Sequence, residues 1–269
     1  MVLIFLCICL SCIGRDWTPH LQNLETNGFT VVSEVFTKEE IVQAAQEFAS
    51  LRSQALELIE TTPAQIRYFG ENNQDHASLY WKKGRQLILQ AGPGRYDFYQ
   101  GFQQGFFGSK NVLHNDALEE LMRHLMGEEF TNYSGMINSL PDSADQYWHR
   151  DTHTLSNYNT DGSKLIALDD FYFTILIPIT VPFTLENGTT EFLAGSHRLS
   201  AHDFDRCEPV QLEVPLGSAL IFNGKINHRG KGNRSDTDRP ALYIVYHKKW
   251  YNDQYRRGVR ELTSIERPD

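Results

Sequence analysis

The second half of the chain alternates short apolar segments with turns rich in Gly and Asn, and this pattern restricts its fold more than any other feature. Short segments rich in Val, Ile, Phe and Tyr, bounded by such turns, are typical of β-strands. Repeated short strands favour an antiparallel barrel or jelly roll. The segments occupy residues 133–140, 171–180, 192–193, 210–214, 219–222 and 241–247.

Two helices are predicted ahead of these strands. Thr37 and Glu40 form a capping-box pattern, and apolar residues recur at helical spacing over residues 41–58. A second helix is predicted over residues 115–126, with an Asn or Asp cap at its start and Gly127 as its end. We interpret both apolar stripes as core, so the chain is predicted to be mainly β with flanking α-helices.

Residues 68–107 are rich in Gly and aromatic side chains. Aromatic walls with a few polar groups are common in small-molecule sites, so these rings are candidates for an apolar substrate pocket. The alternative, which we favour for any single ring, is packing beneath an irregular loop. The rings are Tyr96, Phe98, Tyr99, Phe102, Phe106 and Phe107.

The charge balance excludes some partners. Lys plus Arg number 25 and Asp plus Glu number 34, so the formal net charge is −9. An acidic chain with no basic run argues against a nucleic-acid-binding or anionic-membrane surface. The length is enough to bury a sizeable core, and we interpret residues 15–269 as one domain.

Residues 1–14 differ from the rest in composition, because residues 2–10 are wholly apolar. The segment is too short to span a bilayer comfortably. It resembles the apolar region of a signal peptide or an N-terminal anchor, although no Lys or Arg precedes it. A buried N-terminal strand and a wrongly assigned start are the alternatives. The expected location is the secretory pathway or a membrane in the first case, and the cytoplasm otherwise.

Three residues of the second half form a candidate metal site. His149 and Asp151 are two positions apart, so on a strand they point to the same face. His228 follows the strand at 219–222 and a turn. Two His and one carboxylate suit iron(II) in an oxygenase, which keeps open positions for other ligands. His153 shares the predicted face, so a zinc site of the pattern H-x-D-x-H is also open.

The surroundings of these residues resemble a known family. Residues 148–151, Trp-His-Arg-Asp, resemble the W-H-x-D element of the phytanoyl-CoA dioxygenase family of Fe(II)/2-oxoglutarate oxygenases. Residues 186–198 resemble its E-N-G to G-S-H segment, and residues 228–239 resemble the segment from its distal His to an Arg. These matches cover roughly the second half of the chain in the right order, which one short motif could not do.

The resemblance implies a double-stranded β-helix (jelly roll, cupin-like) and a set of site residues. His149, Asp151 and His228 would hold Fe(II). Arg239, eleven residues after His228, would grip the far carboxylate of 2-oxoglutarate, and dioxygen would be the other co-substrate. Asn138 is expected to touch 2-oxoglutarate from the neighbouring strand, although capping a turn is an alternative role for it.

One position departs from the family pattern. The family often has Ser two residues after the distal His, where it helps to bind 2-oxoglutarate, and this chain has Gly230. Ser235 or a Tyr hydroxyl is expected to substitute. The polar segment 154–164 is a candidate lid, and Thr152 is a candidate for orienting the substrate near the metal.

The implied function is that of a dioxygenase dependent on Fe(II) and 2-oxoglutarate. It would oxidise, and most simply hydroxylate, an unactivated C–H bond of a small organic substrate while 2-oxoglutarate is decarboxylated to succinate. The aromatic segment hints that this substrate is apolar. Two alternatives stay open at this point: a zinc hydrolase built on the same His and Asp cluster, and a non-catalytic jelly-roll binding protein.

Overall fold

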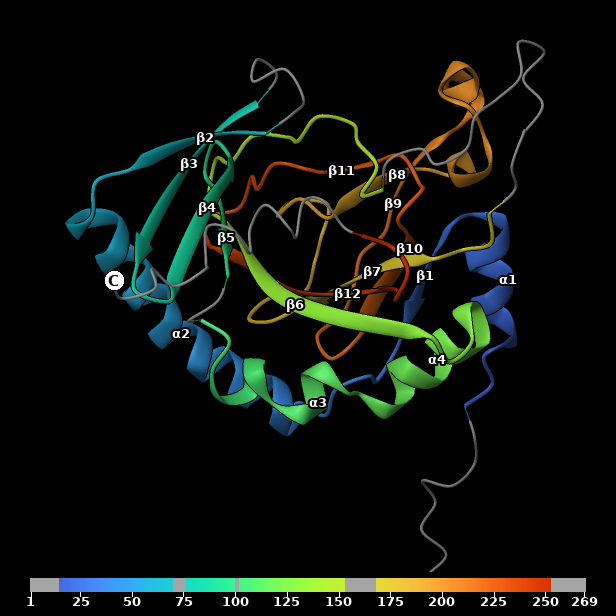
Figure 1. The fold of residues 1–269 in the computed structure, drawn as a ribbon, viewed down its shortest axis with the longest axis horizontal. Coiled ribbons are helices and arrows are strands. Elements are labelled where there is room, and N and C mark those ends of the chain that lie inside the picture. Colours follow the sequence, from blue (N-terminus) through green and yellow to red (C-terminus); the bar gives the residue numbers. More distant parts are fainter. Residues whose placement is uncertain (1–14, 70–75, 100–101, 153–167, 253–269) are drawn as a thin grey trace, which may run out of the picture.

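The computed structural model describes residues 15–69, 76–99, 102–152 and 168–252. Its main feature is a nine-stranded antiparallel sheet in the order β1-β10-β7-β12-β6-β5-β4-β3-β2 (Figure 1). Its strands are β1 (Phe29–Val32), β2 (Gln65–Phe69), β3 (His76–Lys83), β4 (Gln86–Gly92), β5 (Arg95–Phe98), β6 (Phe130–Ser139), β7 (Tyr172–Pro178), β10 (Ala219–Asn223) and β12 (Arg239–Lys248).

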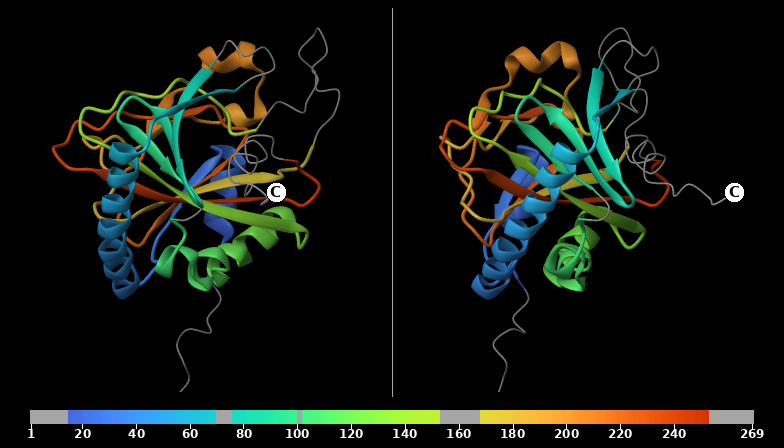
Figure 2. Two further views of the ribbon diagram at one scale, coloured as in Figure 1. Left: turned by 60° about the vertical axis from the view of Figure 1, so that its left-hand side comes forward. Right: turned by 90° about the vertical axis from the view of Figure 1, so that its left-hand side faces the viewer.

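A smaller antiparallel sheet has the order β11-β8-β9. The helices lie along one face of the large sheet, and the small sheet lies on its opposite side (Figures 1 and 2). The elements are β8 (Thr190–Leu193), β9 (Pro209–Gln211) and β11 (His228–Gly230), with helices α1 (Thr18–Thr26), α2 (Lys38–Thr61), α3 (Lys110–Leu113) and α4 (Asp116–Met126). Two facing antiparallel sheets with outer helices confirm the predicted mainly β jelly roll.

The two faces of the large sheet carry different side chains, because successive residues of a strand point to opposite faces. On β7, Phe173, Ile175 and Ile177 belong to the core cluster that contains the buried residues of α2 and α4. Thr174, between them, faces the other way, toward the small sheet. We call this second side the inner face; it carries the metal-site residues.

Both predicted helices are present. The capping box of α2 is complete, since Thr37 accepts from the amide of Glu40 and the Glu40 carboxylate accepts from the amide of Thr37. Helix α4 has an Asn115 cap and ends at Gly127, whose φ of 70° is easily adopted by glycine. These helices cover the outer face of the sheet with apolar side chains.

Residues 68–107 differ from the irregular loop that we expected. The segment is mainly strands β2 to β5, which extend the large sheet. The packing role favoured for the rings is confirmed for Phe98, Phe102, Phe106 and Phe107, which lie in the core cluster with the helices. Tyr99 belongs to a separate buried cluster with Leu87 and Leu89. Strand β3 ends in two lysines and β4 contains an apolar run of only three residues, 87–89, so neither gives a clear strand pattern in the sequence.

The N-terminal segment 1–14 lies outside the described residues. Among the helices that the structure describes, none is both long enough and apolar enough to cross a membrane.

Candidate metal centre

Two segments far apart in the sequence bring the ligand residues together. His228 is the first residue of β11, and it forms an isolated antiparallel bridge with His149. The backbone nitrogen of each residue lies 2.9 Å from the carbonyl oxygen of the other. Asp151 follows in a bend whose amide donates to the carbonyl of Gly224 at 3.0 Å. The predicted regular strand at 149–151 is therefore wrong in detail: one bridge and a bend place the side chains.

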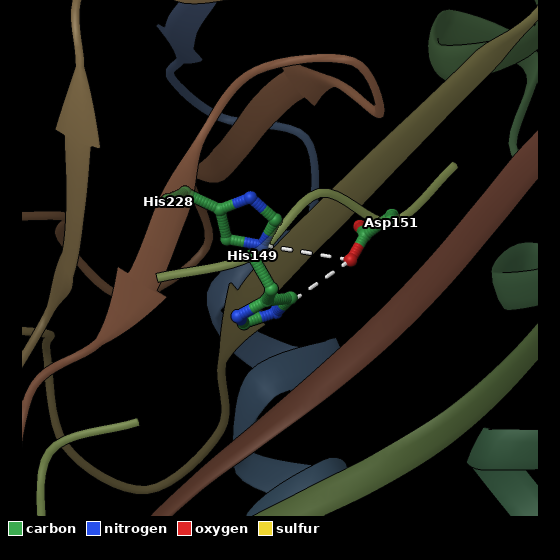
Figure 3. A group of neighbouring side chains, drawn as sticks. All are labelled: His149, Asp151 and His228. Atoms are coloured by element: carbon green, nitrogen blue, oxygen red, sulfur yellow. Dashed lines mark ion pairs between the residues drawn. The ribbon is translucent and has the colours of Figure 1, made fainter. Parts of the chain in front are cut away.

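The three side chains converge on one point (Figure 3). Oδ1 of Asp151 lies 3.5 Å from Nε2 of His228 and 3.9 Å from Nε2 of His149. One ligand atom from each residue lies within 4.8 Å of the other two. His228 is buried, whereas His149 and Asp151 are partly exposed, so the cluster is open on one side.

The hydrogen bonds of both imidazoles select the same tautomer. Nδ1 of His149 lies 2.8 Å from the carbonyl oxygen of Tyr147, and Nδ1 of His228 lies 3.1 Å from that of Ile226. A carbonyl oxygen only accepts, so each Nδ1 carries the proton and each Nε2 presents a lone pair to the cluster. Burial lowers the pKa of His228 to about 4, which keeps it neutral at physiological pH. Two imidazoles that turn Nε2 to the cluster and one carboxylate fit a divalent metal such as Fe(II).

The carboxylate has a partner of its own. Oγ1 of Thr174, on the inner face of β7, donates to Oδ2 of Asp151 at 2.5 Å. This bond occupies one carboxylate oxygen and leaves Oδ1 facing the two imidazoles. Outer-shell hydrogen bonds of this kind orient metal ligands.

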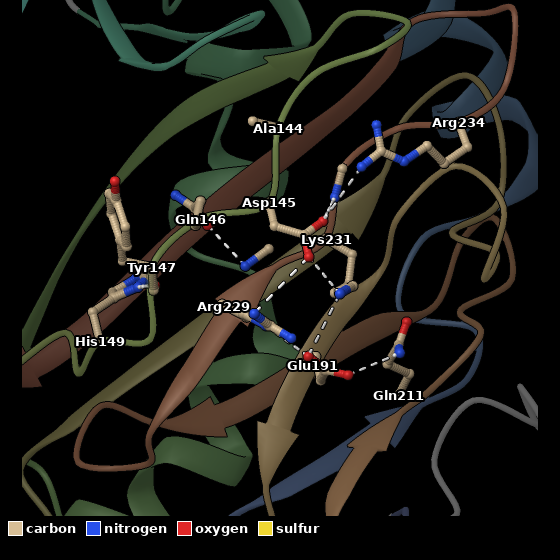
Figure 4. A network of polar contacts seen from close by, with 12 residues as sticks. Ala144, Asp145, Gln146, Tyr147, His149, Glu191, Gln211, Arg229, Lys231 and Arg234 are labelled. Atoms are coloured by element: carbon tan, nitrogen blue, oxygen red, sulfur yellow. Dashed lines mark hydrogen bonds and ion pairs between the residues drawn. The ribbon is translucent and has the colours of Figure 1, made fainter.

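An ionic network ties the segment before His149 to β11 and β8 (Figure 4). Asp145 accepts from Nζ of Lys231 at 2.5 Å and from the amide of Gly232 at 2.7 Å. Nε of Arg229 lies 2.6 Å from Glu191 of β8, and its guanidinium stacks on the ring of Trp148. The network fixes the two ligand-bearing segments to each other on one side of the bridge, before His149 and after His228.

Arg239 is the first residue of β12 and is buried, with 3% of its surface exposed. Its Nη2 donates to Oγ of Ser139 at 3.0 Å, and its guanidinium lies over the ring of Phe183 at 5.3 Å. Its Nε is buried without a hydrogen-bond partner among the described residues. A buried guanidinium with a free N–H on the inner face is suited to an anionic ligand.

The structure does not bring Asn138 to the inner face. Asn138 is the cross-strand neighbour of Pro240, so it points to the face opposite that of Ser139 and Arg239. Its Nδ2 donates to Asp238 at 2.9 Å, and Asp238 pairs with Arg52 of α2. The expectation that Asn138 contacts 2-oxoglutarate is therefore not supported, because alternation along β6 turns it toward the helices.

Other predicted residues are occupied elsewhere or are not described. Oγ1 of Thr152 donates to the carbonyl of Gly224, and the hydroxyl of Ser235 bonds within its own turn, to Asn233 and Thr237. Ser235 is thus not the replacement expected for a serine at position 230. His153 and the candidate lid at 154–164 lie outside the described residues.

Several aromatic residues lie on the inner face near the metal cluster. Tyr172 and Val245 flank the Thr174 position, and a buried cluster joins Tyr172 with Phe171, Tyr243, Val245 and Tyr251. The hydroxyls of Tyr133 and Tyr172 are 2.9 Å apart. Apolar surface beside the site therefore comes from β6, β7 and β12.

Sequence reasoning missed three polar residues of the inner face: Thr174, Ser139 and Arg95. Thr174 was detectable as the one polar side chain within the apolar core of its strand. Ser139 and Arg95 can be recognised as residues of the site only from strand register. Ser139 is the cross-strand neighbour of Arg239, and Arg95 is the cross-strand neighbour of Ser139 on its other side. No local pattern signals that register.

Comparisons with known proteins agree with this site. The family described as phytanoyl-CoA dioxygenase (PhyH) matches residues 24–241. The Fe(II)/2-oxoglutarate-dependent dioxygenase nvfF of Aspergillus novofumigatus is 31% identical over 140 residues, which are 50% of this chain and 45% of that protein. The dioxygenase cdmD of Talaromyces verruculosus is 26% identical over 251 residues, 87% of this chain and 78% of that one.

The chain spans about half the length of the first curated relatives it matches. Among solved structures, AviO1 from Streptomyces viridochromogenes Tue57 has a TM-score of 0.62 at 15% identity, and the match covers 88% of this chain and 97% of AviO1. At that identity the likeness concerns the fold, and it agrees with the jelly roll described above.

Proposed function

The chain belongs to the phytanoyl-CoA dioxygenase family, and from this we propose that it is a dioxygenase dependent on Fe(II) and 2-oxoglutarate. The observation that carries the proposal is the convergence of two imidazole Nε2 atoms and one carboxylate oxygen, from His149, His228 and Asp151. A facial set of two His and one carboxylate leaves positions open for a co-substrate and dioxygen. The relative nvfF, named as such a dioxygenase, supports the same conclusion.

Different residues of this chain would bind the metal and the co-substrate. His149, Asp151 and His228 would hold Fe(II), and Thr174 would fix the orientation of Asp151. Arg239 would bind the far carboxylate of 2-oxoglutarate through its guanidinium, which also donates to Ser139. Bound iron would supply the chemistry by which 2-oxoglutarate and dioxygen give succinate and carbon dioxide while a substrate C–H bond is oxidised.

We also infer a small organic substrate with an apolar surface. The inner face beside Asp151 and Thr174 carries the cluster of Phe171, Tyr172 and Tyr243, whose rings offer apolar contact with hydroxyl groups at their edges. Sites of this make-up favour largely apolar ligands with a few polar groups. Hydroxylation is the simplest outcome of C–H oxidation at such a site.

The test is an anaerobic titration of 2-oxoglutarate into Fe(II)-loaded protein, followed through the visible absorption band of the metal–ligand complex. We expect a band that saturates in the parent protein and needs much more 2-oxoglutarate in Arg239→Met. Arg52→Met, which removes a partly exposed guanidinium from α2, is the matched control and should titrate like the parent.

A protein that binds one iron per chain and gives no band would contradict the proposal. Zinc-dependent hydrolysis that 2-oxoglutarate does not affect would then indicate a zinc hydrolase. Metal binding without hydrolysis or oxidation would indicate a non-catalytic binding protein.

A further inference from the structure

Asp97 is a buried carboxyl on the inner face of the large sheet, with 4% of its surface exposed. The register of β5 with β6, and of β6 with β12, puts it on the same face as Tyr243. Tyr243 is in turn the cross-strand neighbour of Leu176, which is two residues after Thr174 on β7. Asp97 therefore points to the same side of the sheet as Thr174, the residue that orients the metal ligand Asp151.

A glycine lets the side chain of Tyr243 reach Asp97. Gly135 of β6 is the direct neighbour of Tyr243, and a Cβ atom there would lie 2.2 Å from the hydroxyl oxygen of Tyr243 and 2.3 Å from its Cζ. The phenol ring therefore lies across β6, over the position that has no side chain. Its hydroxyl donates to Oδ2 of Asp97 on β5 at 3.4 Å. The ring thus connects the aromatic cluster beside the metal centre with this carboxyl.

One oxygen of the Asp97 carboxyl has no partner. The hydroxyls of Tyr243 and Tyr99 supply hydrogen bonds to the group, but Oδ1 is buried and accepts none. Burial raises the pKa of Asp97 to about 7, and only these hydroxyls oppose the rise, not any Lys, Arg or His of the described residues. A buried polar atom without a hydrogen bond is rare in folded proteins, because it costs stability.

The other neighbours of Asp97 are apolar. Leu89 on β4 and Ile137 on β6 are its direct cross-strand neighbours, and Leu89 is buried in a cluster with Leu87 and Tyr99. A carboxyl in these surroundings loses its hydration and gains only contacts with hydroxyls in return. An aliphatic residue at position 97 would fit the packing better, so binding explains the carboxyl and folding does not.

We propose that Asp97 determines specificity by accepting, through Oδ1, a hydrogen bond from a hydroxyl or amine group of the substrate whose C–H bond is oxidised. The inference rests on the proposed function, since it concerns the substrate of the same site. It defines that substrate as an apolar molecule with a hydrogen-bond donor. The apolar part lies along the rings of Tyr243 and Tyr172, and the bond to Asp97 selects the carbon that faces the metal centre.

The test compares three small probes that share a phenylethyl group. 2-Phenylethanol and 2-phenylethylamine carry a donor, whereas 2-phenylethyl methyl ether does not. Their Kd values are measured by saturation-transfer NMR on the metal-free protein at pH 8, above the pKa of Asp97. The parent should bind the alcohol and the amine about 10- to 100-fold more tightly than the ether, the range for a hydrogen bond to a charged group. Addition of Mn(II) and 2-oxoglutarate should then broaden the signals of the bound probes.

The variants separate the hydrogen bond from the charge. Asp97→Leu removes both, so it should bind all three probes equally. Asp97→Asn keeps an acceptor without the charge, so it should still prefer the alcohol to the ether but bind the amine more weakly than the parent does. Asp238→Asn is the matched control, because Asp238 pairs with Arg52 of α2 on the opposite face, and it should bind every probe like the parent. Thermal unfolding should show both Asp97 variants at least as stable as the parent.

Equal affinities of the three probes for the parent, or binding of none of them, would overturn the inference. A preference for donors that persists in Asp97→Leu, or that Asp238→Asn also loses, would overturn it too. Selection through Asp97 without broadening by Mn(II) would separate this carboxyl from the oxidation site and overturn its role there. Selection through Asp97 in a protein that binds no 2-oxoglutarate in a parallel calorimetric titration would support Asp97 as a binding residue and overturn the proposed function alone.

Discussion

Thr174→Val removes the hydroxyl that orients Asp151 and keeps the shape of the side chain. Oγ1 of Thr174 donates to Oδ2 of Asp151 at 2.5 Å, and Thr174 is buried in the middle of β7. Val has the same branching and a similar volume, so packing on β7 should be preserved. The main loss is the hydrogen bond to the carboxylate.

A hydrogen bond to a charged group contributes roughly 1.5–3 kcal/mol, and loss of an outer-shell partner typically lowers metal affinity about 10- to 100-fold. We therefore expect the Kd for Mn(II) to rise about 10- to 100-fold in Thr174→Val. The assay is anaerobic competition for Mn(II) between the protein and a coloured chelator. The Tm of both metal-free proteins, measured in parallel, separates this effect from a loss of fold.

The matched control is Thr189→Val. Oγ1 of Thr189 is also buried and donates at 2.7 Å, but its acceptor is the carbonyl of Leu212, away from the metal cluster. This variant should lose some stability and keep its metal affinity. If Thr174→Val binds Mn(II) within about twofold of the parent, or if both variants lose affinity equally, Thr174 does not position the ligand.

Three further perturbations test the tight turn at Gly188, the buried carboxyl of Asp97 and the ionic network of Asp145. Gly188→Ala should lower the free energy of unfolding by about 2 kcal/mol or more in a denaturant titration, because Gly188 has a φ of 84° and a Cβ atom would lie 2.3 Å from the carbonyl oxygen of Gly232; an unchanged midpoint would contradict this. Burial raises the pKa of Asp97 to about 7. The native state therefore holds a proton that the unfolded chain releases above pH ~4, and stability falls as pH rises from about 4 to 7. Asp97→Asn should thus gain Tm relative to the parent over that window, and a difference independent of pH would refute it. Asp145→Ala should cost about 1 kcal/mol of stability and weaken Mn(II) binding, since Asp145 ties Lys231 and Gly232 to the segment before His149; unchanged Mn(II) affinity would show that the network does not support the site.

The strands and helices with a clear period could be predicted from the sequence. Strand β7 is apolar except for Thr174, and α2 has a capping box and apolar residues at helical spacing. In both elements the local sequence favours the same structure that packing in the folded chain requires. Strands β2 to β5 could not be predicted, because their apolar runs are short and each strand is held by pairing with the next, as far as β6. Their stability comes from long-range neighbours that no local window contains.

The metal cluster could be anticipated, whereas the surroundings of the co-substrate site could not. His149, Asp151 and His228 stand in a recognisable spacing, although a bridge and a bend, not a regular strand, bring them together. Asn138 was expected to contact 2-oxoglutarate, but successive residues of β6 point to opposite faces, and the face of Asn138 follows only from the register with β12. Arg95 was missed because its cross-strand neighbour Ser139, and Arg239 on the far side of Ser139, are distant from it in sequence and come close only through register.

The most direct test of the metal centre is a crystal structure of the protein soaked anaerobically with Mn(II) and 2-oxoglutarate, with the metal located by its anomalous scattering. We predict one peak within bonding distance of Nε2 of His149, Nε2 of His228 and the carboxylate of Asp151, with the far carboxylate of 2-oxoglutarate against Arg239. A peak elsewhere, or ligation through the Nδ1 atoms that here donate to carbonyls, would contradict this assignment.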